Sequence, residues 1–72
     1  MKVSIITTNG TKIEGNLRTT GTYIVSLDMP SQLINAQLVD TLHAEEISAT
    51  EFGHEWQIIV SRKKIKSITF ND

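Results

Sequence analysis

The stretch VSIITTNGTKIEGNLRTTGTYIVSL, residues 3–27, decides the fold, because apolar and polar residues alternate along it between glycine-containing turns. Side chains on a β-strand point to opposite faces in turn, so this alternation predicts strands. We expect three strands, at residues 2–8, 11–20 and 22–28. Between the first two, Asn9-Gly10 predicts a type I′ turn, whose twist matches that of a hairpin.

Two further glycines indicate where this sheet bends. Gly15 lies inside the second expected strand, between the apolar residues Ile13 and Leu17. A glycine in such a position is typical of a bend, a bulge or a close approach of two backbones. Gly21 allows a turn or a second kink before the third expected strand. The first half of the chain therefore predicts a strongly bent antiparallel sheet.

The segment from residue 29 to residue 55 is ambiguous. Met29-Pro30 ends the third expected strand, because proline has no N–H to donate to a neighbouring strand. Three apolar residues then recur at the spacing of one helical face: Ile34, Leu38 and Leu42. Ser31 is a candidate N-cap for such a helix, although residues 37–44 also fit an alternating strand. We favour a helix or an irregular insertion.

Two more strands are expected towards the C-terminus, from Trp56 to Ser61 and from Ile65 to Phe70. Three consecutive basic residues lie between them: Arg62, Lys63 and Lys64. Short strands in this number predict an all-β fold, a small and strongly bent five-stranded antiparallel sheet. The whole chain, residues 1–72, is expected to form a single domain.

The composition excludes several ways of stabilising so small a domain. The chain has 72 residues and no cysteine, which excludes disulfides and thiolate zinc sites. Two histidines are too few for a metal site built from protein ligands alone. A core of this size supplies about 3 to 5 kcal/mol, so association between subunits is the remaining source of stability.

The sequence also bears on location. It has no apolar run of the roughly 18 residues that a membrane-spanning helix needs. The opening MKVSIITTNG is too short and too β-like for a signal peptide. We therefore expect a cytoplasmic protein.

Charge is unevenly distributed along the chain, although the net charge is only −1. Residues 31–55 contain five acidic residues and no lysine or arginine, whereas residues 56–71 contain four basic residues and no acidic one. Two surfaces of opposite sign are therefore expected.

Catalysis has no positive support in the sequence. No serine lies in a nucleophile-elbow pattern, and no glycine-rich loop precedes a helix to cradle phosphates. His43 and Glu46, with His54 and Glu55 further along, fit no established metal-ligand spacing and are interpreted as a solvated polar face. We expect no enzyme, no cofactor and no small-molecule substrate.

The basic triplet at residues 62–64 has two interpretations. By itself it is typical of a solvated turn that keeps strand edges from pairing with other chains. Next to an aromatic ring it could hold single-stranded RNA, because such proteins combine a basic groove with rings that stack on bases. Tyr23 is the candidate ring, although it could instead be a core residue or pack against a residue on a neighbouring strand. Trp56 is interpreted as a core residue or a subunit contact.

These features together resemble the Sm-like (LSm) family, especially its Hfq branch. The first half of the Sm motif is an alternating strand, Asn-Gly, an apolar residue and Gly-x-apolar, followed by an aromatic residue. Its matches here are Asn9, Gly10, Ile13, Gly15, Leu17 and Tyr23. The ending IIVSRKKIKSI, residues 58–68, is similar to the second half: an apolar strand, a basic residue and two apolar residues three apart.

The resemblance implies the Sm fold, an SH3-like barrel, without the family's N-terminal helix because the first strand is expected to begin at residue 2. Residues 2–28 and 56–70 would be the two halves of the motif, and residues 30–55 a variable insertion. In the family the fourth strand of one subunit pairs with the fifth strand of the next to close a ring. The resemblance therefore implies a homo-oligomeric ring that binds single-stranded RNA, or single-stranded DNA, without catalysis.

In such a ring, Tyr23 would stack on a base, and Arg62, Lys63 and Lys64 would form a basic collar around the pore. The alternative is a structural or assembly protein with an SH3-like barrel that binds a protein partner and no nucleic acid. In that case the triplet would be a solvated turn, and the acidic segment would be the surface that docks the partner.

Overall fold

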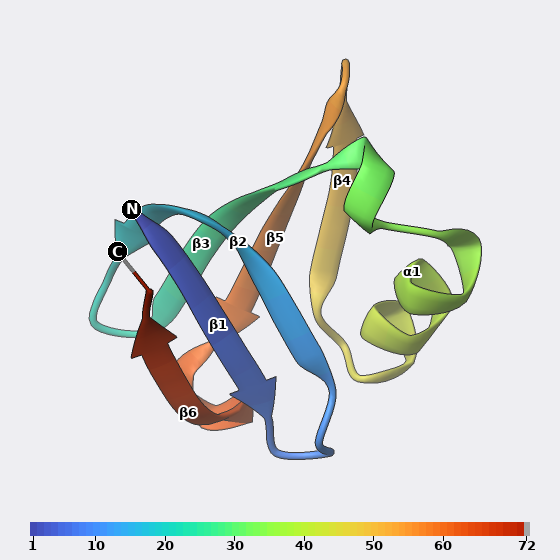
Figure 1. The fold of residues 1–72 in the computed structure, drawn as a ribbon. Coiled ribbons are helices and arrows are strands. Elements are labelled where there is room, and N and C mark those ends of the chain that lie inside the picture. Colours follow the sequence, from blue (N-terminus) through green and yellow to red (C-terminus); the bar gives the residue numbers. More distant parts are fainter. Residues whose placement is uncertain (72) are drawn as a thin grey trace.

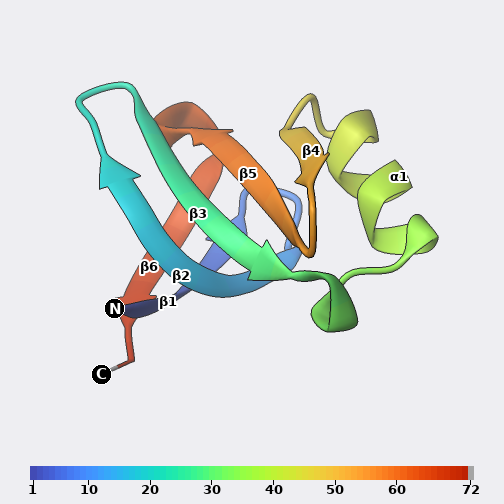
Figure 2. The same cartoon turned by 90° about the horizontal axis from the view of Figure 1, so that it is seen from above.

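The computed structural model, which describes residues 1–71, contains one strongly curved antiparallel sheet with a short helix beside it (Figures 1 and 2). The strands are β1 (Lys2–Thr7), β2 (Lys12–Thr20), β3 (Ile24–Pro30), β4 (Ser48–Phe52), β5 (Glu55–Ser61) and β6 (Ile65–Phe70). The helical elements are the 3-10 turn η1 (Ser31–Leu33), the helix α1 (Ala36–Ala44) and the 3-10 turn η2 (Arg62–Lys64).

The order of the strands across the sheet is β4-β5-β3-β2-β1-β6. Within residues 1–71, the end strands β4 and β6 do not pair with each other, so the sheet is not closed into a barrel. The expectation of a small, mostly β fold is confirmed, but the expected number of five strands is wrong. The sixth strand is β4, which lies in the segment expected to be helical or irregular.

The β1–β2 hairpin has a different turn from the one expected. Gly10 has a φ of 88°, and Glu46 is the non-glycine residue with a positive φ among residues 1–71, so Asn9 lacks the angle that a type I′ turn requires. The Gly10 N–H donates to the Thr7 carbonyl at 2.9 Å, and the Thr7 N–H donates to the Thr11 carbonyl at 2.9 Å. The hairpin therefore has a three-residue loop with the glycine in the left-handed region.

Gly15 lies where β2 and β3 approach each other closely. A Cβ atom at this position would lie 2.4 Å from the Asp28 carbonyl oxygen and 2.8 Å from Leu27 Cδ1. The register between β2 and β3 shifts between Leu17 and Thr19, two residues further on, which leaves Arg18 as a bulge. The glycine thus allows the contact between the strands, and the bulge after it adds to the curvature.

The segment between β3 and β5 contains the helix that the apolar spacing predicts, and the alternative of a strand at residues 37–44 is wrong. The N-cap of α1 is Asn35, whose Oδ1 accepts a hydrogen bond from the Leu38 N–H at 2.8 Å, and not Ser31. Ser31 begins η1 instead, and its hydroxyl donates to the His54 carbonyl at 2.8 Å. The expected cap was wrong because η1 separates the end of β3 from the helix.

The C-terminus of α1 turns the chain back towards β4. The Ile47 N–H donates to the Leu42 carbonyl at 2.8 Å, and the Glu46 N–H donates to the His43 carbonyl at 3.0 Å. Together with the φ of 62° at Glu46, these bonds make a Schellman cap. Leu42 and Ile47 are both buried, so the cap carries the usual apolar contact. Glu45, also buried, accepts a hydrogen bond from the Thr11 hydroxyl and thereby connects the helix to the β1–β2 hairpin.

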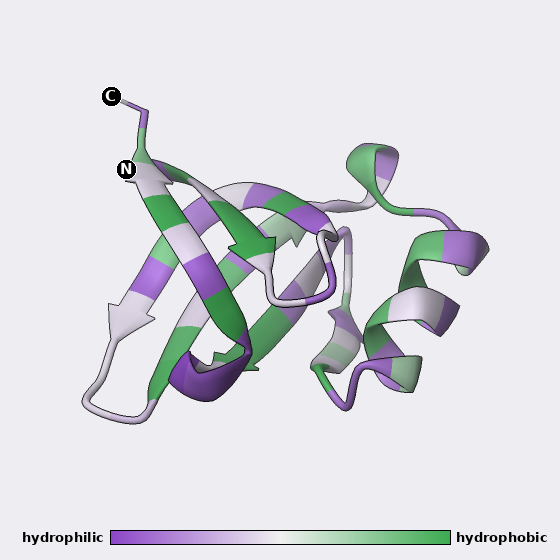
Figure 3. Cartoon of the chain, turned by 90° about the horizontal axis from the view of Figure 1, so that it is seen from below, coloured by the Kyte–Doolittle hydropathy of each residue, from purple (hydrophilic) through white to green (hydrophobic). Residues whose placement is uncertain are grey.

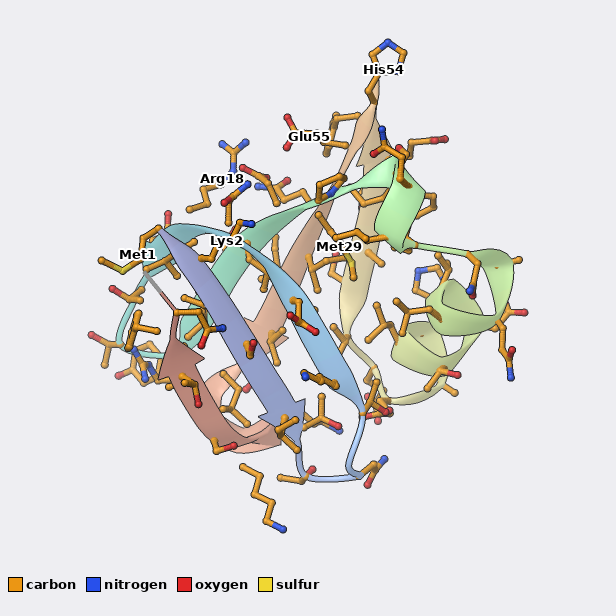
Figure 4. The ribbon with its side chains drawn as sticks, viewed as in Figure 1. Met1, Lys2, Arg18, Met29, His54 and Glu55 are labelled. Carbon is orange, nitrogen blue, oxygen red and sulfur yellow. The ribbon has the colours of Figure 1, made fainter. Side chains whose placement is uncertain are left out.

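The core lies inside the curve of the sheet and is closed at one side by α1 (Figure 2). Hydrophobic and polar residues alternate along the strands, as the sequence predicted (Figure 3). The buried apolar residues are Val3, Ile5, Ile13, Val25, Leu27, Met29, Leu42, Ile47, Ala49, Ile58 and Val60. Met29 lies in this interior, whereas His54 points away from the body at the tip of the β4–β5 hairpin (Figure 4).

Candidate nucleic-acid interface

The pairing of β3 with β5 brings together two turns that are far apart in the sequence. Ile24, the first residue of β3, pairs with Ser61, the last residue of β5. The β2–β3 turn, which ends at Tyr23, therefore lies beside η2, which begins at Arg62. A candidate site forms at this end of the two strands.

The β2–β3 turn presents the ring of Tyr23 to solvent. The Gly21 N–H donates to the Ile24 carbonyl at 2.8 Å, which closes a tight turn between the strands. Tyr23 occupies the outer side of this turn and is 80% exposed. The alternative in which this tyrosine is a core residue is therefore wrong. An exposed ring held on a short turn is available to stack on a planar partner.

Arg62 is fastened to the same turn by two hydrogen bonds. Its backbone N–H donates to the Tyr23 carbonyl at 2.9 Å. Its Nε donates to the Gly21 carbonyl at 2.7 Å, and the rest of the guanidinium makes no hydrogen bond within residues 1–71. The bond to Gly21 fixes the side chain beside Tyr23 while its outer N–H groups stay available for an acceptor.

The three basic residues of η2 do not point to one place. Lys63 is exposed and forms no ion pair within the described part of the chain. Lys64 contacts the β1–β2 turn through its backbone carbonyl, which accepts from the Thr8 N–H at 2.8 Å. Its Nζ lies 4.0 Å from Glu46 Oε1, which makes a weak surface ion pair. Arg62 is therefore the cation that contacts the Tyr23 turn, Lys63 follows it in η2 with an exposed side chain, and Lys64 is paired with Glu46.

The acidic residues of the segment before β5 lie mostly at the far end of the sheet. β5 begins at Glu55 and ends at Ser61, so Glu55 and Arg62 are separated by the length of the strand, about 20 Å. Asp28, opposite Gln57 towards the Trp56 end of β3 and β5, is paired with Arg18 at 3.0 Å. The acidic residue next to η2 is Glu46, which is paired with Lys64. This separation leaves a local positive charge around Tyr23, although the chain as a whole is slightly acidic.

Trp56 does not join Tyr23 in the site. It pairs with Met29 at the opposite end of β3 and β5, and it is half-buried against the hydrophobic core. Of its two interpretations, a core residue or a subunit contact, the first holds in part, because Trp56 packs against the core without being fully buried. The site therefore offers one aromatic ring per chain.

Sequence reasoning missed the part that Gly21 plays in the site. Its carbonyl accepts the hydrogen bond from Arg62, a residue 41 positions later in the chain. No spacing within a motif could reveal this contact, because it depends on the register of β3 with β5. The glycine itself was a visible signal for a turn, but not for the partner of that turn.

Neither a metal site nor a membrane-spanning helix is found in the described part of the chain. Within residues 1–71, no group of three or more potential ligands could hold a metal ion. The His43 ring lies 3.2 Å from the Ala49 carbonyl, while His54 stands at the hairpin tip (Figure 4). No helix among these residues has the length and apolar character needed to cross a membrane.

The site thus combines an aromatic face, a guanidinium and an ammonium group, all on the surface. These groups suit a flexible anionic polymer with planar bases, because rings stack on bases and cations hold phosphates. Comparison of the chain with protein-family models, with curated proteins and with solved structures found no match.

Proposed function

We propose that this protein binds single-stranded RNA, or single-stranded DNA, at the surface formed by the β2–β3 turn and η2. The observation that carries the proposal is the exposed ring of Tyr23, held beside Arg62 by a 2.9 Å hydrogen bond between the two backbones. In this proposal Tyr23 stacks on a base, and Arg62 and Lys63 hold phosphates. Lys64 adds attraction at longer range.

The proposal assigns binding and no catalytic step. It includes the inference that the chain is a divergent Sm-like protein. The five strands expected from that resemblance correspond to β1, β2, β3, β5 and β6, which form a continuous, strongly curved antiparallel sheet. β4 and α1 are then additions within the variable segment, residues 30–55.

Replacement of Tyr23 by alanine tests the stacking role. Stacking contributes about 1 to 3 kcal/mol per base, so Tyr23→Ala is expected to weaken binding of a fluorescent single-stranded RNA by about fivefold or more. The matched control is Phe52→Ala, which removes another exposed aromatic ring, 62% exposed, from β4. Fluorescence anisotropy measures both affinities. Equal affinities of the wild type and Tyr23→Ala would exclude the tyrosine from the site.

We further propose that copies of the chain assemble head to tail into a ring through the edges of their sheets. The resemblance assigns the subunit contact to the strands that are now β5 and β6. The outer side of β5 is covered by β4, from the pair Glu55 and Phe52 to the pair Ile59 and Ser48, so the free edges belong to β4 and β6.

Light scattering tests the assembly. A ring is expected to have a mass several times that of the 8.0 kDa chain, because pairing would protect two strand edges and enlarge a small core. A monodisperse monomer at micromolar concentration would contradict the ring. It would leave the nucleic-acid proposal standing, since Tyr23, Arg62 and Lys63 all come from one chain.

A further inference from the structure

A second candidate site lies at the opposite end of β3 and β5 from Tyr23. A pocket with a volume of about 400 Å³ opens between α1 and the β4–β5 hairpin. Its apolar lining includes Ile34, Val39 and Trp56, and its charged lining is Asp40 and Glu51. A pocket of this volume falls in the range that holds small ligands or single side chains.

The two carboxylates come from opposite walls of the pocket. Glu51 pairs directly with Trp56 across β4 and β5, so both side chains are on the same face of the hairpin. Asp40 belongs to α1, where Ala36, Val39 and Asp40 follow one another at the spacing of one helical face. The indole of Trp56 therefore lies in a pocket bounded by one carboxylate on the hairpin and one on the helix.

Both carboxylates lack a partner within the described part of the chain. Neither Asp40 nor Glu51 forms a hydrogen bond or an ion pair among residues 1–71 through its side chain. Residues 31–55, which form most of the pocket, contain no lysine or arginine that could neutralise them. The pocket therefore has two uncompensated negative charges beside an aromatic ring.

We propose that this pocket binds an arginine side chain of a partner protein. A guanidinium is planar, stacks on an indole and donates to two carboxylates at once, which matches Trp56, Asp40 and Glu51. Nucleic acid is excluded as the occupant, because its phosphates would be repelled by the two carboxylates. An apolar segment alone would leave both charges without a partner.

The N-terminus of α1 at the pocket does not reverse this preference. A helix N-terminus carries a partial charge of roughly +0.5, whereas the two carboxylates carry two full negative charges. The Leu38 N–H, which has no acceptor within the helix, already donates to Asn35 Oδ1. The net field in the pocket therefore favours a cation.

The pocket and the nucleic-acid surface are far enough apart to be occupied together. Trp56 and Arg62 lie at opposite ends of β5, about 20 Å apart along the strand. A chain that binds single-stranded RNA or DNA at one end and a protein with an exposed arginine at the other would connect the two. The pocket does not depend on the proposed RNA binding, because it shares no residue with that surface.

Trp56 is the single tryptophan of the chain, so its fluorescence reports directly on the pocket. The probe is the peptide acetyl-Gly-Arg-Gly-amide, and the comparison peptide has citrulline, a neutral isostere, in place of arginine. A saturable change in Trp56 emission is expected with the arginine peptide and not with the citrulline peptide over the same concentration range. Asp40→Asn and Glu51→Gln are each expected to weaken binding about three- to fivefold.

Glu55→Gln is the matched control, because Glu55 is an exposed carboxylate next to Trp56 in the chain that does not line the pocket. It should bind the arginine peptide as the wild type does, and circular dichroism should show that all variants are folded. The proposal is overturned if the citrulline peptide binds equally well, or if Asp40→Asn and Glu51→Gln keep full affinity. It is also overturned if raising the protein concentration displaces the bound arginine peptide, which would mean that a second copy fills the pocket.

Discussion

Replacing Gly15 by valine is expected to remove most of the stability of the fold. A Cβ atom at this position would lie 2.4 Å from the Asp28 carbonyl oxygen and 2.8 Å from Leu27 Cδ1. Backbone atoms cannot rotate away, so β2 and β3 would have to separate where Leu27 enters the core. Overpacking of this kind costs about 1 to 3 kcal/mol, a large part of the roughly 3 to 5 kcal/mol available to so small a core.

Thermal and urea unfolding followed by circular dichroism measures this effect. The matched control is Gly53→Asn, because Gly53 has open space around it and a φ of 61°, which asparagine tolerates. The control should unfold close to the wild type, whereas Gly15→Val should unfold at a clearly lower temperature and a clearly lower urea concentration. A melting temperature for Gly15→Val equal to that of the wild type would mean that β2 and β3 do not approach each other as closely as described above.

Removing the charges of Arg62 and Lys63 together is expected to abolish most of the affinity for single-stranded RNA. A charge-assisted hydrogen bond contributes about 1.5 to 3 kcal/mol, so Arg62→Ala with Lys63→Ala should weaken RNA binding more than tenfold. Each neutralised phosphate also releases counterions. The slope of log affinity against log salt should therefore become shallower by about 0.7 for each phosphate that the variant no longer neutralises.

Replacing Arg62 also removes its hydrogen bond to the Gly21 carbonyl and so alters the local structure as well as the charge. The single variant Lys63→Ala removes one charge and leaves that hydrogen bond in place. Lys63 is exposed and makes no ion pair within residues 1–71, and its replacement should change the salt slope without changing stability. Lys66→Ala removes the same charge from β6 and is the control. If Lys63→Ala and Lys66→Ala give the same slope, the charge of Lys63 in η2 contributes no more to RNA binding than the charge of Lys66 in β6.

The strands with strong alternation could be predicted from the sequence, and β4 could not. β1, β3 and β5 have apolar residues at every second position, β2 has Ile13 and Leu17 on one face, and β6 has Ile65, Ile68 and Phe70, all of which is visible without a structure. β4 has only Ala49 as a buried apolar residue, and it exists because it pairs with β5, Ala49 lying opposite Ile58. A strand that depends on its partner more than on its own side chains leaves little local signal.

The same limit applies to the candidate sites. The positions of Tyr23 and Arg62 in the two halves of the motif identified both as candidate binding residues. Their contact in space depends on the pairing of Ile24 with Ser61, which the sequence does not show. The pocket around Trp56 depends on how α1 packs against the hairpin, and the sequence showed only an acidic segment next to a tryptophan. Long-range packing decides which side chains of such a segment come together.

The most direct test of the central claim is a titration of ¹⁵N-labelled protein with a single-stranded RNA of about ten nucleotides, followed by amide chemical shifts. The largest changes are expected at residues 21–24 and 61–64, on the β2–β3 turn and η2. Shifts that do not change, or that change mainly along α1 and β4, would contradict the central claim.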